Sequence, residues 1–283
     1  MTAKTILIVI GISVYGVSSV FAIVSLMSPR ITNERLVHAL TAVAAILITM
    51  VLILHGFKAG RIPVFGRFEA LACYSLAVTI SYLHLAKHHH LRGISAILLP
   101  YVTAMLIIGG KSLNENTISI ADGGQNIWLA LHILAAFTGY ALFTLASILA
   151  AVYLMQDYNL KHKLFGNVFQ KFPPLETLDG LMCRQIGFAF LMLSLSMAAG
   201  AVLVRLSGGG SEWLTDPKIT ATIATWIVYA ILLHLRVHSD QHGKKIAIAT
   251  ILGLICVLFT FIGVHLITES VHNFISSGIV EGA

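Results

Sequence analysis

The chain has 283 residues, of which 57% are hydrophobic and only 11% are charged. Soluble domains carry about 25% charged residues, so this composition excludes an ordinary soluble domain and indicates an integral membrane protein. The net charge of +6 does not indicate a nucleic-acid partner, because lysine and arginine collect in the cytoplasmic loops of membrane proteins. The three cysteines lie far apart, and no Cys-x-x-Cys-His sequence is present.

Eight apolar segments are candidates for membrane-spanning helices, each of which needs about 20 apolar residues. In chain order they cover residues 6–26, 36–57, 68–86, 94–109, 127–155, 186–205, 219–236 and 246–268. The first segment is too long for the apolar core of a signal peptide, so we expect it to be retained. The fourth is short and contains Pro100, whereas the fifth is long enough to tilt or project from the bilayer. We predict an all-α fold: a polytopic membrane helix bundle of about eight transmembrane helices, with residues 1–283 as a single domain.

The distribution of lysine and arginine predicts the orientation of this bundle. Eleven of these residues fall in one set of loops: Arg30, Arg35, Lys87, Arg92, Lys161, Lys163, Lys171, Arg184, Arg236, Lys244 and Lys245. The other seven fall in the opposite set: Lys4, Lys58, Arg61, Arg67, Lys111, Arg205 and Lys218. The positive-inside rule therefore predicts both termini outside. It also predicts a cytoplasmic loop over residues 156–185 and an outer loop over residues 206–218.

Several of the thirteen histidines lie at membrane depth, where an ionisable side chain is expensive and indicates function. His132 lies roughly one to two turns inside the outer end of the fifth segment. His272 lies just beyond the outer end of the eighth segment and shares a helical face with His265, while His234 lies at the inner end of the seventh. Two facing neutral imidazoles can be axial ligands of haem iron. From the residues alone, a haem site and a structural or proton-handling set of histidines are equally open.

The predicted outer loop before the seventh segment contains Trp213 and Asp216. A tryptophan ring can pack on a flat haem macrocycle, since both have extended apolar faces. Asp216 and Lys218 have two candidate roles, which are to address the haem propionates or to orient the loop.

Five segments of the chain, in the same order as in the family, resemble the CcsA family of System II cytochrome c biogenesis. They are GRIPVFGRFEALACYSL (60–76), LHILAAFTGYALF (131–143), PPLETLDGLMCRQIGF (173–188), TWIVYAILLHLR (225–236) and GVHLITESVHNF (263–274). The resemblance covers about residues 55–275. It also places this chain near the related CcmC and HemX-like haem-handling membrane proteins.

The resemblance implies a haem-handling membrane protein that presents haem b at the outer face for attachment to apocytochrome c. His132 and His272 would be the axial ligands of the iron, and His234 would lie on the route of haem from the cytoplasmic side. The implied partners are a CcsB-like membrane subunit, apocytochrome c and the lipid bilayer of a bacterial inner (cytoplasmic) membrane. No nucleic-acid partner is expected. No catalytic residue is expected either, because the thiols belong to the acceptor; an enzymatic role would be as a subunit of a cytochrome c synthase (haem lyase).

The chain departs from the WWD motif of this family. Gly210, Trp213, Asp216, Pro217 and Lys218 match the motif, whereas Gly209 and Thr215 replace two tryptophans and Ile219 replaces a glutamate. An aromatic platform reduced to one ring should grip haem less firmly. His265 stands where the family has an asparagine and is an alternative ligand.

Two alternative hypotheses remain from the sequence. A HemX-like, non-enzymatic regulator of haem biosynthesis would act on the level of glutamyl-tRNA reductase. A haem b electron-transfer subunit would hold two haems between histidine pairs. The pairs would be His132 with His265, and His234 with His38 or His84.

Overall fold

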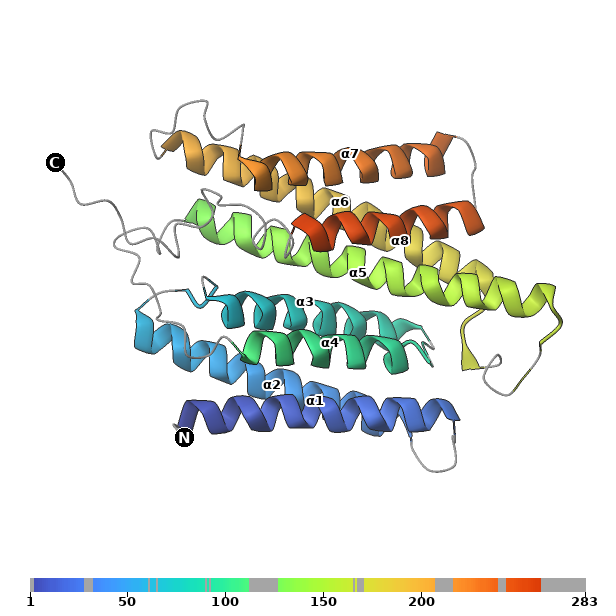
Figure 1. Ribbon diagram of the computed structural model, residues 1–283, viewed down its shortest axis with the longest axis horizontal. Helices are drawn as coiled ribbons and strands as arrows, with labels where there is room; N and C mark the ends of the chain where they lie inside the picture. Colours follow the sequence, from blue (N-terminus) through green and yellow to red (C-terminus); the bar gives the residue numbers. More distant parts are fainter. Residues whose placement is uncertain are drawn as a thin grey trace.

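The computed structural model describes residues 3–27, 33–60, 62–64, 66–89, 91, 93–111, 127–164, 166, 171–206, 216–238 and 243–260. These described residues form eight α-helices and no β-strand. The helices run roughly along one common axis (Figure 1). The prediction of an all-α, polytopic bundle of about eight helices is therefore confirmed.

The helices match the eight apolar segments in order. Their bounds are α1 (Ala3–Met27), α2 (Glu34–Ala59), α3 (Arg67–His88), α4 (Ser95–Gly110), α5 (Ile127–Lys161), α6 (Leu175–Leu206), α7 (Pro217–His238) and α8 (Lys244–Leu258). Within the described residues, six helices are long and apolar enough to cross a membrane, and α4 is a shorter apolar helix. The predicted last segment extends to residue 268, and its part from residue 261 onward lies outside the described residues.

The predicted loop over residues 156–185 is wrong at both ends. Helix α5 continues to Lys161, and α6 already begins at Leu175. The first turn of α6 is closed by the backbone N–H of Leu178, which donates to the carbonyl of Pro174 at 3.0 Å. Its early turns contain several charged residues, including Glu176 and Asp179, and these lower the local hydropathy. The hydropathy pattern therefore identifies only the apolar part of a longer helix.

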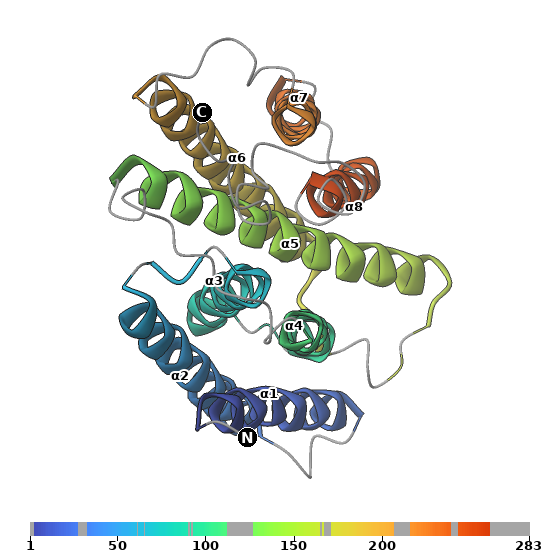
Figure 2. The same cartoon turned by 60° about the vertical axis from the view of Figure 1, so that its left-hand side comes forward.

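Helix α5 lies between two groups of helices (Figures 1 and 2). On one side lie α1 to α4, where α1 packs against α2 and α4, and α3 packs against α5. On the other side lie α6, α7 and α8, where α6 and α8 pack directly against α5. Helix α7 contacts mainly α6 and α8, and only a small part of it is buried.

Buried hydroxyl groups join the helices on the α1–α4 side. The Tyr74 hydroxyl lies 2.6 Å from the Tyr101 hydroxyl and 2.6 Å from Thr144 Oγ1, which connects α3 with α4 and α5. The Tyr15 hydroxyl donates to Thr79 Oγ1 at 3.1 Å, which connects α1 with α3. In an apolar medium such bonds hold helices together, because the alternative is an unsatisfied polar group.

Large aliphatic side chains cover the outside of the bundle. Val20, Ile46 and Leu252 are 60%, 66% and 57% exposed, and they belong to three different helices. A soluble monomer rarely exposes apolar surface on this scale, whereas a bilayer solvates it. The described helices therefore form an integral membrane protein.

Candidate functional site

His132 lies on α5, within the second turn of the helix, as the sequence predicts. Its Nδ1 lies 2.8 Å from the backbone carbonyl oxygen of Ser196 on α6. A carbonyl can only accept a hydrogen bond, so the neutral imidazole must carry its proton on Nδ1. The lone pair then lies on Nε2, the atom that can coordinate a metal ion. Histidine ligands commonly have their second nitrogen fixed by a carbonyl in this way.

A second bond joins the same two residues in the opposite direction. Ser196 Oγ donates to the backbone carbonyl of His132 at 2.9 Å, and it also lies 3.2 Å from His132 Nδ1. Ser196 is only 2% exposed, so these bonds are shielded from solvent. Ser196 could not be predicted from the sequence, because its partner is 64 residues away and the acceptor is a backbone atom.

Asp216 caps the N-terminus of α7. Its Oδ1 accepts the backbone N–H groups of Lys218 at 2.9 Å and of Ile219 at 3.2 Å, and the residue is only 6% exposed. Pro217 follows at the first helical position, where a proline costs no hydrogen bond. These contacts fix the start of α7. The loop before Asp216 lies outside the described residues, so the choice between the two expected roles of Asp216 stays a prediction.

The start of α7 and the start of α5 belong to one end of the bundle, where α2 and α6 finish (Figure 1). We call this end the His132 end. The Tyr140 hydroxyl of α5 is hydrogen-bonded to Thr222 of α7, which joins the two helices near this end. His132 and Asp216 are therefore brought to the same region, on neighbouring elements.

His234 lies four residues before the end of α7, at the opposite end of the bundle, and its side chain is exposed. Two residues later, Arg236 Nη2 donates to Asp179 Oδ2 of α6 at 2.5 Å. Asp179 Oδ1 also accepts the backbone N–H of Gly243, which precedes α8, at 3.3 Å. One carboxylate thus joins α6, α7 and α8 near His234. Asp179 belongs to the Pro-Pro-Leu-Glu segment, whose structural role the sequence analysis does not identify.

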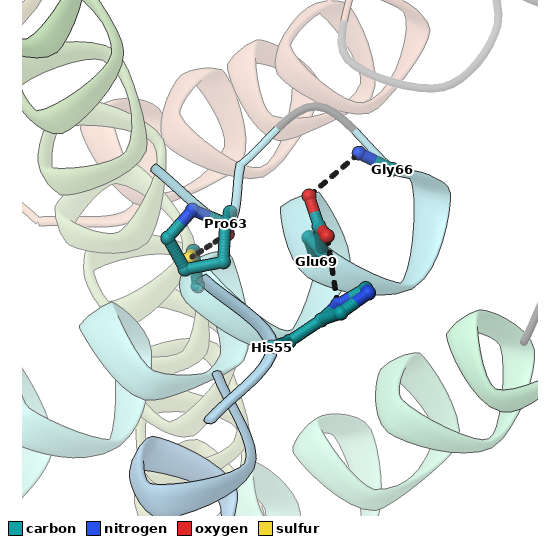
Figure 3. A network of polar contacts seen from close by, with 5 residues as sticks. His55, Pro63, Gly66 and Glu69 are labelled. Atoms are coloured by element: carbon teal, nitrogen blue, oxygen red, sulfur yellow. Dashed lines mark hydrogen bonds and ion pairs between the residues drawn. The ribbon is translucent and has the colours of Figure 1, made fainter. Parts of the chain in front are cut away.

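Glu69 forms a second buried polar cluster at the His132 end, between α2 and α3 (Figure 3). Its Oε1 lies 2.8 Å from His55 Nδ1, and its Oε2 accepts the backbone N–H of Gly66 at 2.9 Å. The Glu69 side chain is only 1% exposed. Nearby, the Cys73 thiol donates to the carbonyl of Pro63 at 3.6 Å. The glutamate of the family-like segment 60–76 therefore closes the α2–α3 turn.

Three of the predicted site residues, Trp213, His265 and His272, lie outside the described residues. The pairing of His132 with His272 or His265 therefore stays a prediction. Within the described part of the chain, no three His, Cys, Asp or Glu side chains are grouped to hold a bare metal ion. A single imidazole with a fixed proton fits a metal that arrives inside a macrocycle, which needs the protein only for axial ligands.

The fold and this site define a class: a polytopic membrane protein with a histidine bonded between two helices near one end of its bundle. Residues 64–272 match the cytochrome c assembly protein family, and the chain belongs to that family. This match covers most of the residues from α3 onward.

Individual relatives agree with the family match. The chain is 28% identical over 252 residues to the cytochrome c biogenesis protein CcsA of Guillardia theta, with 83% of each chain covered. It is 30% identical over 265 residues to CcsA of Prochlorococcus marinus (strain NATL2A), again with 83% of each chain covered. It is 29% identical over 266 residues to CcsA of Chlamydomonas reinhardtii, with 92% of this chain and 72% of that protein covered.

Proposed function

We propose that this protein handles haem in cytochrome c biogenesis and presents haem b at the His132 end of its bundle for attachment to apocytochrome c. The single observation that supports this most directly is the bond from His132 Nδ1 to the Ser196 carbonyl, which leaves Nε2 as the ligating atom. The names of the relatives favour cytochrome c biogenesis over regulation of haem synthesis. No contact among the described residues favours a haem b electron-transfer subunit.

In this proposal the named side chains bind haem, orient its binding site or shield it. His132 ligates the iron on one side, and His272 ligates it on the other, with His265 as the alternative. Trp213 packs on the macrocycle, while Asp216 fixes the direction of its loop by capping α7. His234 meets haem at the cytoplasmic end of α7. Haem supplies the vinyl groups across which the acceptor's cysteine thiols add to form thioether bonds.

The proposed environment follows from the orientation predicted by the positive-inside rule. Both termini and the His132 end face outside, and the Asp179–Arg236 pair faces the cytoplasm. The membrane is a bacterial inner membrane, and a CcsB-like membrane subunit completes the site. Since the WWD loop keeps only one of its tryptophans, we expect a lower haem affinity than in a chain with the full motif.

The test is the absorption spectrum of the purified full chain in detergent. Wild type is expected to show a Soret band, and His132→Ala and His272→Ala are each expected to reduce haem per protein by more than about tenfold. His84→Ala is the matched control, because this exposed histidine lies at the other end of the bundle. Deletion of the gene is expected to abolish holo-cytochromes c. A Soret band that survives in His132→Ala, together with normal cytochromes c in the deletion, would contradict the proposal.

A further inference from the structure

Helices α5 and α6 pack against each other beside His132. A methyl group placed on Gly200 of α6 would lie 2.8 Å from His132 Nδ1 and 3.1 Å from its Cε1. Carbon atoms do not approach a ring so closely, so any side chain at residue 200 must displace the imidazole. Gly200 therefore provides the space in which the ring of His132 lies.

The two helices cannot simply move apart to make room for a side chain at residue 200, because they are also in close contact elsewhere. One to two turns further along the same seam, a methyl group on Gly139 of α5 would lie 3.2 Å from the carbonyl oxygen of Ala189 and 3.2 Å from the backbone nitrogen of Leu193. Small residues thus set the interhelical distance on both sides of the contact. The bond between Ser196 Oγ and the His132 carbonyl fixes the register of the two helices between these glycines.

The turn from Ser196 to Gly200 therefore acts on His132 from two directions. The Ser196 carbonyl accepts the hydrogen bond from Nδ1–H at 2.8 Å, and Gly200 leaves room for the ring in the position from which it makes that bond. A hydrogen bond donated by Nδ1–H leaves more electron density on Nε2 and makes it a stronger donor to a metal. A stronger axial donor stabilises ferric iron more than ferrous iron, so it lowers the reduction potential of a haem.

We propose that Ser196 and Gly200 are positioning residues that set the redox poise of the haem bound at His132, by fixing the tautomer and the donor strength of this ligand. This inference rests on the proposed function. It names two residues that act on the same site through its histidine ligand.

The first experiment compares Gly200→Ala with Gly187→Ala in the full chain. Both glycines lie on α6, but a methyl group on Gly187 would meet nothing within 4 Å. Gly200→Ala is expected to reduce haem affinity by about tenfold and to make the reduction potential of the remaining haem more positive. Gly187→Ala is expected to change neither quantity. Equal potentials in wild type and Gly200→Ala would overturn the inference.

The second experiment separates positioning from a general loss of packing. His132→Gly removes the tethered ring, and free imidazole added to this variant supplies an axial ligand without the tether. In that background, adding Gly200→Ala is expected to leave the reduction potential unchanged. A shift as large as in the His132 protein would show that Gly200 acts on the fold alone, and the inference would be wrong.

The remaining outcomes are also decisive. If Gly200→Ala does not fold, as judged by size-exclusion chromatography, Ser196→Ala replaces it, because this change removes the 2.9 Å and 3.2 Å contacts of the hydroxyl and keeps the backbone carbonyl. A smaller shift to more positive potential is then expected, and no shift would overturn the inference. If His132→Gly without imidazole binds haem as wild type does, the proposed function itself has failed.

Discussion

Two histidines at the same end of the bundle each have Nδ1 close to an oxygen atom, and the two oxygens differ in charge. His132 presents Nδ1 to an uncharged backbone carbonyl of α6, and His55 presents Nδ1 to the buried carboxylate of Glu69. The carbonyl fixes a tautomer without adding charge, so the ring can serve as a neutral ligand. The carboxylate gives His55 a charged partner and ties it into the α2–α3 turn. The two sites therefore differ in the charge placed beside the imidazole: none beside His132 from its carbonyl partner, and a carboxylate beside His55.

The strongest test of the difference between His132 and His55 is to replace each histidine by phenylalanine. His132→Phe is expected to reduce haem per folded protein by more than about tenfold, with little loss of stability. His55→Phe is expected to keep haem binding and to lower the free energy of unfolding by about 3 kcal/mol, because it removes the partner of a buried carboxylate. Soret absorbance and unfolding by denaturing detergent, measured on both variants, check the crossed pattern. Loss of haem in both variants would show that His132 and His55 do not have different roles.

A smaller effect is expected when only the charge of the carboxylate is removed. Glu69→Gln keeps the shape of the side chain but weakens its bonds to His55 and Gly66, and we expect a loss of about 1–2 kcal/mol in unfolding free energy. Glu176→Gln is the control, since Glu176 also lies in the first turn of a helix but is exposed. Haem per folded protein should be the same in both. If Glu69→Gln alone lost its haem, the α2–α3 turn would belong to the haem site.

The smallest expected effect concerns the cap of α7. Asp216→Ala should cost about 1 kcal/mol in unfolding free energy, and Asp216→Asn should cost much less, because asparagine also caps helices well. Haem content should follow stability in both variants. An asparagine variant that is stable but has lost haem would mean that the charge of Asp216 touches the cofactor, and the site would then extend from His132 into α7.

The helices could be predicted from the sequence because a helix surrounded by lipid needs a long run of apolar residues. The early start of α6 could not, because Glu176, Asp179 and Arg184 are charged residues of a helix and resemble a loop in a hydropathy pattern. The depth of His132 also follows from the sequence.

The partners of the site histidines could not be predicted. Ser196 contributes a backbone carbonyl, which every residue type has, so its identity does not indicate the contact. It is also 64 residues from His132, so no local sequence pattern links the two. The pairing of Glu69 with His55 likewise needs the packing of α2 against α3.

The contacts of Asp179 have a consequence for how the protein is made. Arg236 and Gly243 follow Asp179 by 57 and 64 residues, so a ribosome must synthesise both before the carboxylate has its final partners. Until then α6 enters the membrane with an acidic group near its end, and such a group is costly in an apolar medium. Arrival of α7 and the start of α8 removes that cost. Helices α7 and α8 therefore complete the assembly of a helix inserted before them, and a chain truncated before Gly243 should be recognised as unfinished.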